Sequence, residues 1–246
     1  MPSGTRLATL ATLVVSLGML PASPAGAAGA GGVSGASLSA FNFAATTDAP
    51  DVVAWENFNG TNATNLNGTV TDGGAKTWAV NPAGGSWTIQ SNAARSTSAN
   101  TSLVIDGGSA NGSGVATLVR NGATTFDMGL TVNRNSGGTQ FLTAEWTSAS
   151  NGSIELWAYN GGWTALAWVT NLYPGGIATA PASITLTSTS SSANALSAFI
   201  NGVSVVSTTL SAANITTFKN ATHQLVGPYQ WTSNGLGWDN FHFDNP

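Results

Sequence analysis

The chain has 246 residues, only 7% of them charged, and it carries a formal net charge of −4 at neutral pH. Its six lysines and arginines are scattered from Arg6 to Lys219, so they do not form the basic patch that phosphate binding needs, which argues against a nucleic-acid partner. The chain has no cysteine, which excludes a disulfide framework, a lipoprotein anchor and thiol chemistry.

Residues 1–27 have the layout of a secretory signal peptide. Arg6 lies in a short polar start, an apolar run follows from Leu7 to Leu20, and Ala25-Gly26-Ala27 fits the small-residue cleavage pattern. The apolar run has about 14 residues, which is short for a bilayer span. We therefore predict a secreted, extracellular protein with no membrane span after cleavage. An uncleaved apolar anchor or a buried helix is the alternative.

Two further segments follow the predicted signal peptide. Residues 28–50 are rich in Gly, Ala and Ser and lack periodicity, so we predict a flexible linker. Residues 51–246 form the predicted folded domain. A domain of this size can bury a sufficient core without disulfides.

From Val52 onward the sequence shows no convincing helical periodicity. Short alternating segments are instead separated by Gly, Asn and Ser, which predicts strands and tight turns. Turn signals every 8 to 12 residues favour a sandwich or barrel, and about 195 residues suit an all-β, two-sheet antiparallel jelly roll. Strands are expected at 86–90, 101–105, 114–120, 125–133, 139–147, 153–159, 163–170, 184–188, 196–201, 203–210, 224–231 and 238–243.

Two similar segments lie near the two ends of this domain: WENFN at 55–59 and WDNFH at 238–242. Their flanks do not match, so we interpret them as two strands in similar environments that lie side by side, rather than as a duplication. Alternation predicts that Glu56 points inward with Phe58, and that Asp239 shares a face with Phe241 and Phe243. A sharper alternative is a structural Ca²⁺ held by Glu56 and Asp239, although two acids do not fill such a cage.

A series of short motifs follows in chain order: W-x-I at 87–89, GLTVNRNSGGTQFLTAEW at 129–146, ELW at 155–157, GGW at 161–163, AFINGVSV at 198–205, GPY at 227–229 and the final WDNF. Their order resembles the concanavalin A-like lectin/glucanase superfamily, in its laminin G-like bacterial branch, over about residues 51–245. The resemblance implies a jelly roll with one concave sheet, whose concave face or rim loops often bind glycans. Some members bind Ca²⁺ and others are purely structural or adhesive.

An aromatic cluster is the strongest local signal for function. On the segment 153–159, one strand face carries Ile154, Leu156 and Ala158, and the other carries Glu155, Trp157 and Tyr159. If the aliphatic set is the core face, two aromatics and a carboxylate project together, a combination that suits a neutral sugar. The other possibility is that these rings are packed inside. The cluster consists of Trp146, Trp157, Tyr159, Trp163, Trp168 and Tyr173.

Catalysis is not the favoured interpretation. The superfamily's glucanases carry an E-x-D-x-E run, and this chain has a single acid in the matching strand. Glu145 and Glu155 lie on strands expected to form a hairpin, but the loop leaves open whether they share a face. Only His223 and His242 are available, and neither a serine-hydrolase elbow nor a metal-binding His spacing occurs.

We therefore predict a secreted, non-catalytic, lectin-like domain that binds a polysaccharide or surface glycan by aromatic stacking. Trp157 and Tyr159 are the predicted ligand-binding residues, followed by Glu155 and Trp163. No cofactor is expected apart from the possible structural Ca²⁺. The alternatives are a structural or adhesive module of a cell surface or phage virion, and an atypical glycoside hydrolase. The oligomeric state stays open.

Overall fold

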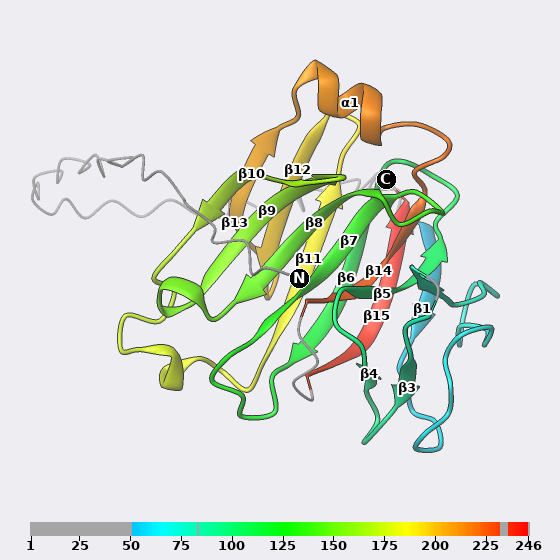
Figure 1. The fold of residues 1–246 in the computed structure, drawn as a ribbon, viewed down its shortest axis with the longest axis vertical. Coiled ribbons are helices and arrows are strands. Elements are labelled where there is room, and N and C mark those ends of the chain that lie inside the picture. Colours follow the sequence, from blue (N-terminus) through cyan, green and yellow to red (C-terminus); the bar gives the residue numbers. More distant parts are fainter. Residues whose placement is uncertain (1–50, 83, 232–235, 246) are drawn as a thin grey trace, which may run out of the picture. The chain divides into compact units, whose positions relative to one another are not determined.

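The computed structural model describes residues 51–82, 84–231 and 236–245. The predicted signal peptide (1–27) and linker (28–50) lie outside the described residues. Within the described part of the chain, no helix is long and apolar enough to cross a membrane. Almost all of the regular structure there is β-strand, arranged in two antiparallel sheets (Figure 1), so the predicted all-β jelly-roll sandwich is confirmed.

The two sheets differ in the number and order of their strands. One sheet has eight strands in the order β13-β12-β11-β6-β15-β4-β3, with β1 also paired to β15, and the other has seven in the order β10-β9-β8-β7-β14-β5-β2. The eight-stranded sheet comprises β1 (Asp51–Glu56), β3 (Trp87–Ile89), β4 (Ala94–Ser96), β6 (Gly112–Val119), β11 (Ser183–Ser190), β12 (Ala195–Ile200), β13 (Val203–Thr209) and β15 (Gly237–Asn245). The seven-stranded sheet comprises β2 (Ala79–Asn81), β5 (Thr101–Asp106), β7 (Asp127–Arg134), β8 (Gln140–Thr147), β9 (Ser153–Asn160), β10 (Trp163–Val169) and β14 (Leu225–Gln230).

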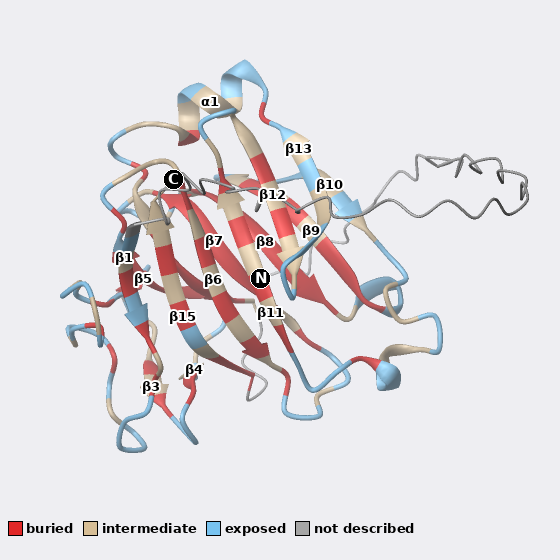
Figure 2. Cartoon of the chain, turned by 180° about the vertical axis from the view of Figure 1, so that it is seen from behind, coloured by how far each residue is buried: buried red, intermediate tan, exposed pale blue. Residues whose placement is uncertain are grey.

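The core lies between the sheets, because each strand turns alternate side chains toward its partner sheet. Along β6 and β11, buried residues alternate with partly exposed ones, and Figure 2 shows the resulting bands. On β6 the inward residues include Ala116 and Leu118, and on β11 they include Ile184 and Leu186. The tight turn between β12 and β13 uses Asn201 and Gly202, both with positive φ, as the Asn-Gly pair predicts.

The first and last strands of the described domain pair directly, as predicted. β1 runs antiparallel to β15, with Trp55 opposite His242 and Glu56 opposite Phe241. Figure 1 shows β1 and β15 beside each other although they come from the two ends of the domain. The two similar segments therefore meet where Trp55 and Glu56 end β1, whereas residues 57–59 lie beyond that strand.

The predicted direction of Asp239 is wrong, and a β-bulge is the reason. Between Asp239 and His242 the pairing with β6 gains one residue, and Asn240 adopts a positive φ of 48°. Asp239 lies opposite Thr117, on the outer face of the sheet, whereas Phe241 and Phe243 are buried in the core. An extra residue reverses the side-chain direction beyond it, and strand alternation alone does not reveal its position.

The sequence did not predict several short elements. Helix α1 (Ala212–Phe218) has only seven residues, too few for a clear periodicity, although the Ser211 hydroxyl caps it by accepting from the Asn214 amide. Strand β2 has three residues. Two single-turn 3-10 helices, η1 (Ala149–Asn151) and η2 (Ile177–Thr179), lie in loops beside β8–β9 and before β11.

Trp238 on β15 offers a test of the core. It is fully buried, with its ring centroid 4.9 Å from that of Trp87. We expect Trp238→Ala to lower the free energy of unfolding by about 3–5 kcal/mol, the usual cost of truncating a buried tryptophan. Trp55→Ala, on the adjacent strand but 46% exposed, is the control and should cost much less. Urea denaturation gives both values, and equal losses would contradict this packing.

Candidate functional site

The outer side of the seven-stranded sheet at β8, β9 and β10 carries most of the predicted binding residues. On β9, Ile154 and Leu156 are fully buried between the sheets. Because side chains alternate along a strand, Glu155, Trp157 and Tyr159 point to the opposite side, where each is partly exposed. We call this side the aromatic face. Its members on the three strands are Phe141, Glu145, Glu155, Trp157, Tyr159, Trp163 and Trp168.

Strand β10 adds two tryptophans to the aromatic face. Trp163 lies opposite Tyr159, and Trp168 lies opposite Glu155. Trp168 lies five positions after Trp163, so simple alternation would place them on opposite sides. A register shift between Ala165 and Ala167 inserts one residue and returns Trp168 to the aromatic face. Trp168 is 49% exposed and therefore accessible, although it was predicted only as a member of the aromatic cluster and not as a ligand-binding residue.

Trp163 is the centre of the aromatic packing. Its ring contacts five others, so the rings support one another and their orientations are mutually constrained. Tyr229 and Trp231, at the end of β14, belong to this cluster although neither was predicted to. The centroid distances from Trp163 are 5.0 Å to Tyr159, 5.3 Å to Trp231, 5.5 Å to Phe141, 6.0 Å to Trp157 and 6.2 Å to Tyr229.

Glu155 is held in one orientation by two uncharged donors. The Ser153 hydroxyl donates to its Oε1 at 2.7 Å, and the Trp157 indole Nε1 donates to its Oε2 at 3.0 Å. Neither donor neutralises the carboxylate. Glu155 is therefore a preset hydrogen-bond acceptor beside two tryptophan rings.

Glu145 shares the aromatic face with Glu155. The β8–β9 register places the two directly opposite each other, which decides a question that the loop between them left open. Glu145 is only 1% exposed, however, whereas Glu155 is partly exposed. A ligand on this face would therefore meet Glu155 first.

A buried arginine supports the other end of the aromatic face. The Arg134 guanidinium lies 4.2 Å from the ring centroid of Phe141 and donates to Asn81 Oδ1 at 2.7 Å. Burial lowers the pKa of Arg134 to about 10. At 1% exposure this cation anchors the sheet and is not offered to solvent.

Two members of the predicted aromatic cluster, Trp146 and Tyr173, do not lie on the aromatic face. Trp146 is fully buried between the sheets, and its indole Nε1 donates to the Tyr173 hydroxyl at 3.1 Å. Trp146 is thus a core residue. Trp157, Tyr159 and Trp163, by contrast, are partly exposed on the aromatic face.

The structure does not bring the two predicted Ca²⁺ ligands together on one face. Glu56 is buried and accepts hydrogen bonds from the Phe58 amide at 3.1 Å and the Trp78 indole at 3.3 Å. Asp239 points away from the core, as described above. Among the described residues, no group of three or more His, Cys, Asp and Glu side chains could hold a metal ion. Calcium binding stays a prediction.

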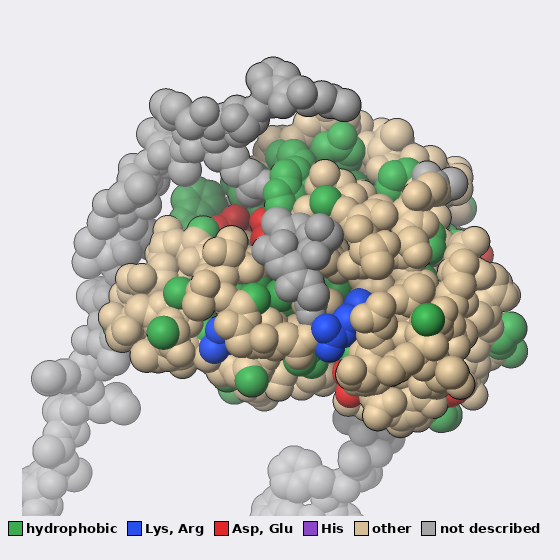
Figure 3. Space-filling model, turned by 60° about the horizontal axis from the view of Figure 1, so that its bottom comes forward, with side chains coloured by type: hydrophobic (Ala, Val, Ile, Leu, Met, Phe, Trp, Pro, Cys, Tyr) green, Lys and Arg blue, Asp and Glu red, His purple; other side chains and the backbone are tan. Residues whose placement is uncertain are grey.

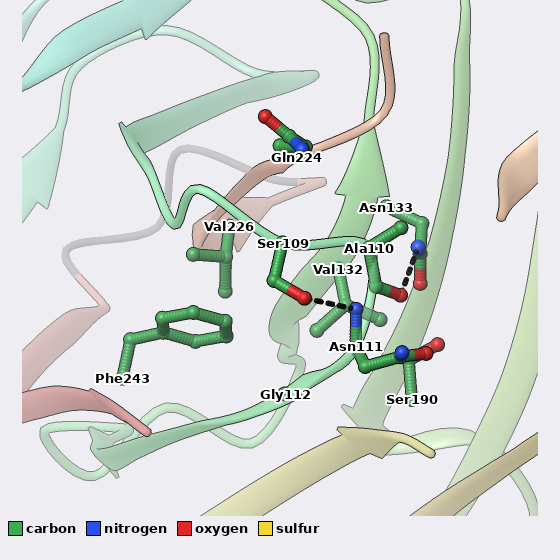
Figure 4. Close-up of a pocket in the computed structure, with 10 residues that line it drawn as sticks. All are labelled: Ser109, Ala110, Asn111, Gly112, Val132, Asn133, Ser190, Gln224, Val226 and Phe243. Carbon is green, nitrogen blue, oxygen red and sulfur yellow. Dashed lines mark hydrogen bonds between the residues drawn. The ribbon is translucent and has the colours of Figure 1, made fainter. Parts of the chain in front are cut away.

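Two hollows lie away from the aromatic face. The first, drawn in Figure 4, has a volume of about 10 Å³, room for about one water molecule and too small for a sugar. Asn133 contributes to it and donates to the Ala110 carbonyl. The second hollow has a volume of about 350 Å³ and lies where β11, β12 and β13 meet the loop between β10 and β11. Its lining is mainly apolar: Leu172, Tyr173, Pro181, Ile184, Ile200, Asn201, Val203 and Val205.

The surface chemistry is largely uncharged. Figure 3 shows one side of the molecule, where backbone and uncharged polar side chains cover most of the coloured area and charged atoms are sparse. Rows of hydroxyls illustrate this on the eight-stranded sheet, where Ser113 bonds Thr189 at 2.9 Å and Ser197 bonds Ser207 at 2.7 Å. Such a surface binds water through hydroxyls instead of ions.

Comparison with known proteins identifies the fold. No protein-family model and no curated protein matches the chain. Among solved structures, a protein of unknown function with a galectin-like fold from Bacillus subtilis is similar, with a TM-score of 0.50 and 13% identity over 78% of this chain and 98% of that one. A GH43 protein from Bacillus licheniformis gives a TM-score of 0.51 and 11% identity over 74% of this chain but only 39% of its own. The chain has a concanavalin A-like jelly-roll fold. At these identities the likeness extends to the fold and no further.

Glu56 gives this fold a pH dependence of known sign. Burial raises the pKa of its carboxyl above the ordinary value of 4.5, and the nearby Asp72 charge also raises it. Ionisation is thus less favourable in the folded state, so the Glu56 contribution to stability falls as pH rises from 4.5 through the folded-state pKa. We expect Glu56→Gln to remove this fall, as measured by urea denaturation from pH 4 to 8. Asp72→Asn should reduce it only in part. Parallel curves for wild type and Glu56→Gln would contradict this account.

Proposed function

We propose that the chain is an exported, non-catalytic carbohydrate-binding module that holds a glycan on the aromatic face. The observation that supports this most strongly is the presentation of Trp157, Tyr159 and Glu155 together on the side of β9 opposite the core. Export rests on the signal peptide predicted at residues 1–27.

The proposed mechanism divides the ligand between two kinds of contact. The apolar C–H face of a pyranose ring packs on an indole or phenol ring, where it buries apolar surface. Glu155, oriented by Ser153 and Trp157, accepts hydrogen bonds from sugar hydroxyls. Preset acceptors cost little ordering on binding, which favours affinity.

The geometry of the aromatic face favours weak binding to an extended chain. Mutual packing fills the centre of the cluster, and neither described hollow lies there. A ligand would therefore lie across the face instead of entering a deep pocket. Several weak contacts along one polysaccharide, or several modules on one surface, raise the overall affinity by multivalency.

Trp157→Ala tests this function. Truncation removes a stacking ring and one of the two donors that orient Glu155. We expect the affinity for a binding polysaccharide to fall at least about ten-fold, as is common for a central tryptophan at an interface. Affinity electrophoresis against a panel of soluble neutral polysaccharides, with and without Ca²⁺, provides the measurement.

Trp55→Ala is the control for that experiment. Trp55 is exposed but lies on the eight-stranded sheet, so its loss should leave glycan binding unchanged. No binding by the folded wild type to any polysaccharide would reject the glycan-binding function. A structural or adhesive module of a cell surface or virion would then be the better account.

A hydrolase is the second candidate, because Glu145 and Glu155 lie opposite each other on the aromatic face. Retaining glycosidases use two carboxyl groups about 5–5.5 Å apart. The burial of Glu145 argues against it, since a catalytic acid must reach the substrate. If the chain hydrolyses glycans, Glu155→Gln should abolish reducing-sugar release while the protein still folds. We expect no release from wild type, and release that Glu155→Gln abolishes would establish catalysis.

A further inference from the structure

Glu155 and Trp168 form a cross-strand pair at the accessible edge of the aromatic face. They lie directly opposite each other on β9 and β10. Residues opposed in this way have Cβ atoms about 4.5–5.5 Å apart and point to the same side of the sheet. Since β10 is an edge strand and Trp168 is 49% exposed, a ligand can reach this pair from solvent.

The surroundings of this pair leave a negative charge beside exposed aromatic surface. The hydrogen bonds to Glu155 from Ser153 and Trp157 come from uncharged groups, so they orient its carboxylate without neutralising it. Glu145 places a second acidic side chain on the other side of Glu155. Arg134 on β7 lies two strands from Glu155 and three from Trp168, and it is 1% exposed, so its charge is not presented to a ligand at Trp168.

We propose that Glu155 and Trp168 form a subsite for a positively charged sugar, a 2-amino-2-deoxyhexose whose amine is protonated. An ammonium group is attracted both to a carboxylate and to the face of an indole ring, and tryptophan is the best aromatic partner for a cation. The same carboxylate repels the acid group of a uronic acid. This inference rests on the proposed glycan-binding function and deepens it by naming the sugar class.

The pairing also explains why the subsite would distinguish closely related sugars. N-acetylation keeps the sugar ring and its hydroxyls but removes the positive charge. Stacking on Trp157 and Tyr159 would then be retained, while the attraction to Glu155 and Trp168 would be lost. Exposed cation–π and ion-pair contacts are each worth a few-fold in affinity, so the expected preference is about five-fold or more.

Calorimetric titration with defined oligosaccharides tests this subsite. Matched hexamers of glucosamine, N-acetylglucosamine, glucose and galacturonate are compared at pH 5.5 on the wild-type chain. We expect the glucosamine hexamer to bind about five-fold or more tightly than its N-acetylated form, and the galacturonate hexamer to bind most weakly. Raising the salt concentration should reduce the preference, because screening weakens charge interactions.

Variants separate this inference from the proposed function. Glu155→Gln should bring the glucosamine to N-acetylglucosamine affinity ratio close to one, and Trp168→Ala should lower that ratio. Trp55→Ala, of nearly equal exposure at 46%, should leave it unchanged. If neutral hexamers bind but the wild-type ratio is one, or if Glu155→Gln keeps the wild-type ratio, the amino-sugar subsite is wrong and glycan binding stands. If no hexamer binds to the folded chain, the amino-sugar subsite fails, and the polysaccharide panel described above then decides whether glycan binding fails with it.

Discussion

The two-residue periodicity of the β8–β9 pair is the constraint on which the rest of this site depends. Burying Ile154 and Leu156 against the opposite sheet leaves Glu155 and Trp157 no direction except outward. A register slip by one residue would expose the aliphatic set and bury a carboxylate, and both changes are costly. The packing of the core and the presentation of the aromatic face are therefore consequences of the same pairing. A substitution that weakens one is expected to disturb the other.

Two of the few charged residues, the buried Arg120 and Arg134, hold loops of the protein in place. Arg120 donates to three backbone carbonyls, of Pro181, Ala123 and Ala180, at 2.6–2.7 Å. Arg134 similarly bonds Asn81. Guanidinium groups with several fixed donors suit this role, since each can satisfy more than one loop carbonyl. In these contacts the arginines hold loops in place, which agrees with the scattered basic residues of the sequence.

The aromatic face is a compromise between packing and access. Contacts around Trp163 fix the rings in place, which reduces the ordering cost of binding, but they also occupy surface that a ligand would otherwise use. Trp168, outside that network in its ring contacts and half exposed, contributes area that packing has not used. Trp157 and Tyr159, in contrast, both pack against Trp163 and keep one partly exposed side for a ligand. The jelly-roll fold supplies the sheet that carries these side chains, and the side chains determine any function, because fold alone does not.

Much of this architecture was determined by the local sequence. Alternating segments and Asn-Gly or Gly-Gly turns predicted most strands to within two residues at each end. The aliphatic side of β9 predicted that Trp157 would point away from the core. Tertiary structure decided the rest. The bulges at Asn240 and near Leu166 reverse alternation for Asp239 and Trp168, and a bulge depends on how two strands pair instead of on one strand's pattern. Likewise, Tyr229 and Trp231 join Trp163 only because β14 follows β7 in the sheet order, a long-range pairing that no local pattern specifies.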